Sequence, residues 1–207
     1  YKDLGDYVKS LHYNQKGLDI VEKKHLIREV LLFSNIIEIK LIANNNLEDA
    51  DLEDLSEQCD KLLSSYGHEL VVANSIYVYK ALTKFRQKKY SSVVDILEES
   101  KAKIADSLDG NIFEQAQILL MLARKYQEQD LNQELIDLEK EIQLEGYEYP
   151  YWMGYYVYKL FGKEKGNKYL SDAVDDIKSK QGQLEEKAVK EFSESFYVRL
   201  VLKEWEK

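Results

Sequence analysis

The chain has 207 residues, of which 44% are hydrophobic, and its formal net charge is −9. This hydrophobic content excludes extended disorder, and the length suffices for one large domain with a substantial core. The negative charge counts against a nucleic-acid partner, because binding to phosphates requires a basic surface. Nine glycines and one proline allow short loops only, which favours helix hairpins over a β-sandwich or barrel. We therefore expect an all-α fold.

Residues 1–24 are the first expected helix, with Leu4, Val8 and Leu11 facing the core. A first hairpin spans residues 25–65. Its opening helix carries an apolar residue every three or four positions and ends at a run of three asparagines. Its second helix begins with acidic residues, which the helix dipole favours at that end.

Two further hairpins are expected at residues 68–108 and 112–144. The opening helix of the later one is apolar on two sides, from Phe113 to Tyr126, as expected for a helix between neighbours. Its partner has leucine and isoleucine in regular three-four spacing. A glycine-containing turn separates the two hairpins.

The last hairpin is expected at residues 150–180, and a final helix at 184–205. Pro150 fits a first helical turn, where its missing amide donor costs nothing. Gly162 is suited to end the first helix of this hairpin. The final helix has an apolar stripe that could cover the end of a helical stack, formed by Ala188, Phe192, Phe196, Leu200 and Trp205.

This last hairpin resembles a tetratricopeptide repeat, in which small residues stand where the paired helices touch and a large residue stands between them. Gly154, Gly166 and Ala173 take the small positions and Leu170 the large one. The resemblance implies a right-handed α-solenoid of stacked antiparallel hairpins. The whole chain, 1–207, would then be a single helical-repeat domain with a C-terminal capping helix.

The same spacing recurs 73 positions earlier, an offset that two repeat units would account for. The unit between the two departs from the pattern, because Glu134 and Glu141 stand where small residues are expected. The earlier set consists of Ala81, Val93, Leu97 and Ser100.

The C-terminal stretch is also similar to the repeat tail of large bacterial signalling proteins, in which a class III nucleotide cyclase or another effector precedes an ATPase module. The similarity lies in a glycine-ended helix, a small-residue helix after it, and a closing helix with Phe192 and Phe196 before Arg199. The proline and asparagine expected near Val198 are missing. This resemblance implies a regulatory tail, and no cyclase or ATPase motif occurs in this chain.

No cluster of catalytic residues is visible in the sequence. His12, His25 and His68 lack partners at metal-ligand spacing, and there is no phosphate-binding loop or nucleophile signature. Cys59 lies on an apolar helix face, which indicates a core residue rather than a reactive thiol. We therefore expect no enzymatic activity, no cofactor and no metal.

The expected cellular location also follows from features that the sequence lacks. The single cysteine cannot form an internal disulfide, and no signal peptide is visible. The most apolar stretch, residues 30–43, is shorter than the about 20 residues that a membrane span needs. We expect a cytoplasmic chain without a membrane span. Because it begins at Tyr1 rather than methionine, we also expect a processed product or a piece of a longer protein.

In tetratricopeptide repeats the first helix of each hairpin lines a concave groove. Here the matching positions are apolar and aromatic, and they lack the lysine, arginine and asparagine with which family members hold a peptide carboxylate. We expect this groove to bind an apolar or aromatic protein segment, or to be filled from within by the N-terminal segment or a tightly wound superhelix. Its residues are Val78, Leu82, Phe85, Leu119, Ala123, Tyr126, Tyr151, Tyr155 and Tyr158.

Three function classes follow. The first is a non-catalytic protein-interaction or regulatory module, whose partner is a protein or peptide, including upstream domains of the same polypeptide. The second is a freestanding adaptor, exported or cytoplasmic. The third is a helical protein that binds a small molecule in the aromatic groove. A homo-oligomer is compatible with each of them.

Overall fold

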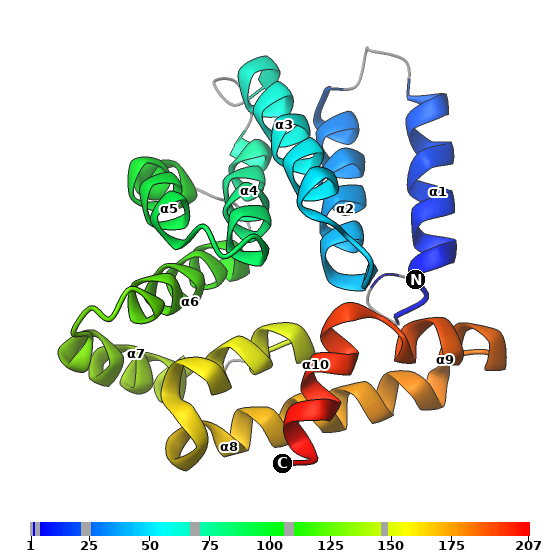
Figure 1. The fold of residues 1–207 in the computed structure, drawn as a ribbon. Coiled ribbons are helices and arrows are strands. Elements are labelled where there is room, and N and C mark those ends of the chain that lie inside the picture. The colour runs from blue at the N-terminus through cyan, green and yellow to red at the C-terminus, as the bar shows by residue number, and fades with distance from the viewer. Residues whose placement is uncertain (1, 3–4, 22–25, 67–70, 106–109, 146–148) are drawn as a thin grey trace.

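The computed structural model describes residues 2, 5–21, 26–66, 71–105, 110–145 and 149–207 (Figure 1). All regular structure in this part of the chain is helical, which confirms the all-α expectation. The helices follow the expected order, and four of them run past the expected hairpin bounds by one to three residues. They are α1 (Tyr7–Ile20), α2 (Leu26–Ala43), α3 (Asp49–Tyr66), the 3-10 turn η1 (Val71–Asn74), α4 (Ser75–Arg86), α5 (Tyr90–Ala105), α6 (Gly110–Tyr126), α7 (Asn132–Glu145), α8 (Tyr151–Gln183), α9 (Glu186–Ser193) and α10 (Phe196–Trp205).

Three of the hairpin turns pass through a residue with a positive φ angle. These residues are Lys88 (φ 59°) after α4, Glu128 (φ 60°) after α6 and Gly162 (φ 77°) within α8. At the first two, the amide of the next residue donates to the carbonyl oxygen five residues earlier, over 2.9 and 3.1 Å. This closure satisfies carbonyls that the end of a helix leaves free. At Gly162 the chain reverses, so that residues 151–161 and 163–183 form the two arms of the expected hairpin (Figure 1).

The two arms of α8 touch through small residues, as the sequence predicts. A Cβ atom added at Gly154 would lie 3.3 Å from Cβ of Ala173 and 3.1 Å from the carbonyl oxygen of Tyr169. A Cβ atom at Gly166 would lie 2.8 Å from the carbonyl oxygen of Tyr158. Backbone stands against backbone here, so these positions cannot take a larger residue without moving an arm.

The helices follow one another in an arc that returns to its start. In Figure 1 the chain runs from α1 and α2 over α3 to α6, then through α7 and α8, and α9 and α10 come back beside the N-terminus. Contacts join α2 to α4, α4 to α6, α6 to α8, α8 to α10, and α10 to α2. We call this closed series of contacts the inner circuit. It brings the last helix of the chain against one of the first.

The expectation of a single final helix at 184–205 is wrong. The helix breaks at Glu194 and Ser195, giving α9 and α10. Phe192 of α9 packs on the rings of Tyr7 and Tyr151, with centroids 6.0 and 5.7 Å away. The buried residues of α10 face other neighbours, and one straight helix could not serve both contacts.

The break also changes which residues are inside. Ala188 and Phe192 are buried as expected, but Trp205 is 44% exposed. Phe196 and Leu200 are only half-buried. In α10 the fully buried side chains are instead Tyr197, Val198 and Val201.

In α1, too, the buried residue differs from the expected one, by one position. Tyr7 is buried, whereas Val8, expected to face the core, is 54% exposed. Tyr7 is held inward by its contacts with Phe192 and Tyr151. Leu4 lies outside the described residues.

Candidate functional site: the groove between α5 and α7

Most of the residues expected to line a concave groove belong to the buried core. Tyr155 is half-buried, and Tyr126 is 41% exposed. The others are at most 8% exposed: Val78, Leu82, Phe85, Leu119, Ala123, Tyr151 and Tyr158.

Helix α10 covers one part of this surface. The hydroxyl of Tyr197 hydrogen-bonds that of Tyr156, whose ring lies 5.2 Å from the ring of Phe85. The Arg86 guanidinium lies 3.8 Å from the centre of the Phe196 ring. Burial raises the pKa of Tyr197 to about 12, so its hydroxyl stays neutral. The chain itself therefore fills this part from within.

The N-terminal segment covers another part. The hydroxyls of Tyr7 and Tyr151 lie 2.5 Å apart, and Nζ of Lys2 forms a 2.8 Å ion pair with Glu38. The Tyr79 hydroxyl also donates to Glu38, over 2.9 Å. Filling by the N-terminal segment was one of the expected alternatives. Covering by α10 was not foreseen.

A cavity of about 500 Å³ remains between the N-terminal segment and helices α2, α4, α6 and α8. We call it the inner cavity. Two ion pairs line it, Lys2 with Glu38 and Lys180 with Asp176, each 2.8 Å long. The side-chain oxygen of Gln115 is buried there and has no hydrogen-bond partner among the described residues.

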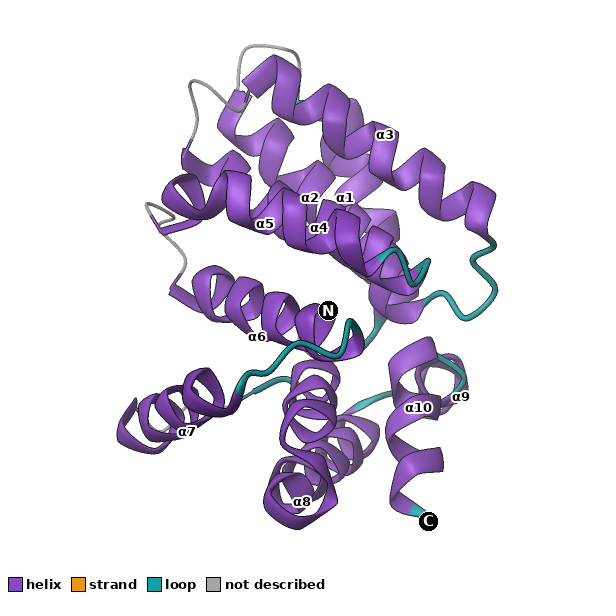
Figure 2. Cartoon of the chain, turned by 60° about the vertical axis from the view of Figure 1, so that its left-hand side comes forward, coloured by secondary structure: helices purple, strands orange, loops and turns teal. Residues whose placement is uncertain are grey.

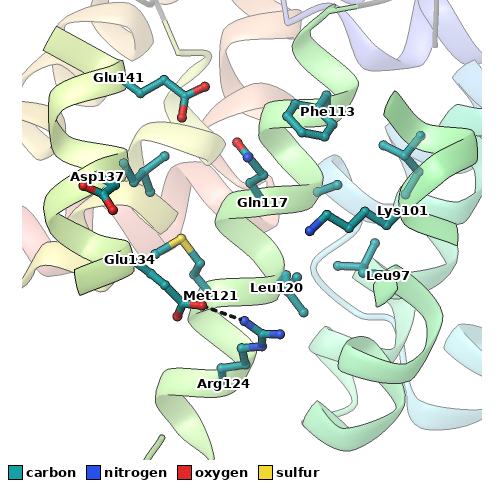
Figure 3. A pocket seen from close by; sticks show the side chains of 13 residues that line it. Leu97, Lys101, Phe113, Gln117, Leu120, Met121, Arg124, Glu134, Asp137 and Glu141 are labelled. Atoms are coloured by element: carbon teal, nitrogen blue, oxygen red, sulfur yellow. Dashed lines mark hydrogen bonds and ion pairs between the residues drawn. The ribbon is translucent and has the colours of Figure 1, made fainter. Parts of the chain in front are cut away.

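A second hollow, of about 260 Å³, opens between α5 and α7, with α6 as its floor (Figure 3). Figure 2 shows these three helices following one another along one side of the molecule. We call the hollow the α5–α7 groove. It is lined by Leu97, Lys101 and Ile104 of α5, by Phe113, Ala116, Gln117, Leu120, Met121 and Arg124 of α6, and by Glu134, Asp137, Leu138 and Glu141 of α7.

The floor of the groove is apolar. Phe113, Ala116 and Leu120 stand three or four positions apart along α6, so their side chains share one face of that helix. Phe113 and Leu120 are only half-buried, and solvent reaches them. This is one of the two apolar sides expected for α6. It faces an open groove instead of a packed neighbour.

Arg124 joins the two walls at one end of the groove. Its guanidinium forms an ion pair with Glu98 of α5. A second ion pair, 3.2 Å long, joins it to Glu134 of α7 (Figure 3). A guanidinium can serve two carboxylates because its N–H groups point in several directions. Arg124 therefore links the two walls.

The α7 wall is acidic. Glu134, Asp137 and Glu141 stand three and four positions apart, on the face of α7 that borders the groove. Glu141 has no ion-pair partner within the described part of the chain. Neither does Lys101, on the α5 side. Both charges can therefore meet an incoming group.

The floor contains one polar group that is not satisfied. The side-chain oxygen of Gln117 is buried, with no hydrogen-bond partner among the residues described. Figure 3 shows this side chain between the two walls. A buried acceptor without a donor is unfavourable, and a donor from a bound molecule would relieve it.

Two glutamates in the sequence indicate this groove. Glu134 and Glu141 occupy the positions where the α8 hairpin has Gly166 and Ala173. The small residues let the arms of α8 touch. A glutamate cannot take such a place, because its charge must stay in water. The helix that carries these glutamates borders an open groove.

Comparison of the chain with protein-family models, with curated proteins and with solved structures gave no match. Among the described residues, no group of three or more histidines, cysteines and carboxylates is placed to hold a metal ion. None of the described helices is both long and apolar enough to cross a bilayer. Cys59 is buried in the core, and burial raises the pKa of its thiol to about 12. The function is therefore inferred from the groove itself.

Proposed function

We propose that this chain is a non-catalytic protein-interaction module that receives one face of a partner helix in the α5–α7 groove. The observation that carries the proposal is the apolar floor, open to solvent between two charged walls. Helices with an apolar face bind in grooves of this kind, with side chains at three-four spacing as anchors. The partner helix can belong to another protein or to an upstream domain of the same polypeptide.

The shape of the groove favours a helix over a compact ligand. Its volume of about 260 Å³ is below the range of about 300–1,000 Å³ typical of small-molecule sites. Its floor extends from Phe113 to Arg124. At a rise of about 1.5 Å per residue this is about 16 Å, the length of about three helical turns.

The interaction module stays the first function class, with a different surface from the concave groove. Of the groove residues named at the outset, Tyr126 and Tyr155 keep accessible surface. Binding to the others would require α10 to leave its place on Tyr156, or the N-terminal segment its place on Tyr151. The α5–α7 groove needs no such opening.

A second candidate is small-molecule binding in the inner cavity. Its volume of about 500 Å³ lies within the usual range, and its charged groups and the Gln115 side chain could orient a polar ligand. Thermal stabilisation by small polar metabolites, unchanged by variants in the α5–α7 groove, would favour this function over the first.

The test of the first function is Leu120→Glu, which places a charge in the apolar floor. The probe is a set of stapled helical peptides of about four turns, each with leucines along one face. Loss of a leucine contact together with burial of a charge should weaken the best binder by at least about tenfold, measured by fluorescence anisotropy.

The matched control is Ile136→Glu, because Ile136 lies on α7 outside the groove and is 44% exposed. Circular dichroism establishes that both variants are folded. Equal affinity of the two variants, or no binding of any peptide to the unchanged chain, would contradict the proposed function.

A further inference from the structure

We propose that the helix received by the α5–α7 groove is a basic amphipathic helix, whose Lys or Arg side chains lie along α7. This inference rests on the proposed function and names its partner by chemistry. It follows from the distribution of charge around the groove, from the unsatisfied acceptor in its floor, and from the charge of the whole chain.

The α7 wall of the groove is negative. Glu134, Asp137 and Glu141 line the groove from α7, against Lys101 of α5 and Arg124 of α6. Arg124 is already shared between Glu98 and Glu134, so it offers little attraction to a further anion. The carboxylates that Arg124 does not engage lie toward the other end. Glu141 has no ion-pair partner in the described residues, and Asp137, whose side chain is 61% exposed, pairs only with Lys140 of its own helix, over 3.5 Å.

The positions of these carboxylates match one edge of a docked helix. Asp137 and Glu141 are one turn apart on α7. A partner helix lying along α7 presents residues at the same interval, so two basic side chains one turn apart can each meet a carboxylate. Between them and the floor the partner needs apolar residues, which Phe113 and Leu120 would contact.

Gln117 supports the same partner chemistry. Its buried side-chain oxygen can only accept a hydrogen bond, and it lies between the acidic wall and the floor. Lysine and arginine are donors without an acceptor, so a basic side chain satisfies this oxygen. A glutamate in the same place would meet this oxygen until the Gln117 amide turned to present its NH2 group.

The whole molecule adds a long-range contribution in the same direction. Its formal charge of −9 attracts basic segments and repels acidic ones. Many basic helices also bind anionic lipid surfaces or nucleic acids through charge alone. The apolar floor of the groove is what this chain offers in addition to negative charge.

The experiment uses two stapled peptides with the same leucine face, one flanked by Lys and Arg and the other by Glu. We expect the unchanged chain to bind the basic peptide at least about tenfold more tightly than the acidic one at low salt. The preference should shrink as the salt concentration rises, because exposed charges are screened.

The charge-reversal variant is Asp137→Lys with Glu141→Lys. We expect it to lose at least about tenfold in affinity for the basic peptide and to gain affinity for the acidic one. The matched control, Glu57→Lys with Asp172→Lys, makes the same change in net charge at exposed positions of α3 and α8. It should bind the basic peptide within about twofold of the unchanged chain.

The outcomes separate the two proposals. If neither peptide binds the unchanged chain, the helix-receiving groove itself is wrong. If the acidic peptide binds as tightly as the basic one, or if the two charge variants behave alike, the groove stands and the basic partner is wrong. Both proposals are supported if the unchanged chain and the control variant prefer the basic peptide and the groove variant prefers the acidic one.

Discussion

One carboxylate outside the groove, that of Glu53, joins two neighbouring helices. Glu53 of α3 accepts hydrogen bonds from Lys84 (2.8 Å), Gln87 (3.2 Å) and Lys89 (3.2 Å), which lie at the end of α4 and in the turn after it. The Lys84 ammonium, with Gln87 and Lys89, lowers the pKa of this carboxyl to about 2. Glu53 therefore links the first hairpin to the second.

This pKa gives a pH-dependent prediction. Since the pKa is lower in the folded state than the ordinary value of 4.5, the stabilisation is present above pH 4.5 and is lost as the pH falls toward 2. Glu53→Gln should lower the free energy of unfolding at pH 7 by about 0.5–1 kcal/mol, a small effect because the pair is exposed.

Urea denaturation at pH 7 and at pH 3 measures the effect, with Glu57→Gln on the same helix as the control. The difference between Glu53→Gln and the unchanged chain should shrink at the lower pH. A difference that is the same at both values would show that the ion pairs do not stabilise the fold.

At the scale of the element, periodicity predicted the helices well and their neighbours poorly. The stripe around Val30, Ile37 and Leu41 is buried as expected, because an apolar face must be covered by something. Periodicity does not say what covers it. The groove positions Val78 and Leu82 were assigned to a partner, whereas the chain's own helices bury them. The α5–α7 groove was missed for the same reason, although its glutamates marked a departure from the repeat.

The contact between the arms of α8 gives a prediction at this scale. Gly166→Ala would place a methyl group 2.8 Å from a backbone oxygen, and the arms would have to separate. We expect a loss of about 1–3 kcal/mol in the free energy of unfolding, the usual cost of overpacking. Chemical denaturation measures it.

Gly182→Ala, in the same helix, is the control. No atom lies within 4 Å of its added Cβ, so alanine should be neutral or stabilising by up to about 1 kcal/mol. If both variants are equally stable, the arms do not touch as described.

At the scale of the whole molecule, the inner circuit should make distant helices unfold together. Tyr197 is fully buried and lies at the contact of α10 with α8, against Trp152 and Tyr156. Tyr197→Ala should cost about 3–5 kcal/mol, as for other large core truncations. Because α10 also contacts α2, the amides of α2 should exchange their hydrogens faster in this variant.

The control is Trp205→Ala on the same helix, where the side chain is 44% exposed and the loss should be below about 1 kcal/mol. Unchanged exchange in α2, in a Tyr197→Ala variant that is clearly less stable, would mean that the closing contact transmits no stability.

The contact of α10 with α2 also bears on how the protein is made. On the ribosome α2 is complete 153 residues before α10 begins, counting from Ala43 to Phe196. The hairpins can form in turn as they emerge, since each relies on nearby sequence. The side of α2 that meets α10 must wait for the end of synthesis. During that interval this side of α2 stays uncovered and accessible to chaperones.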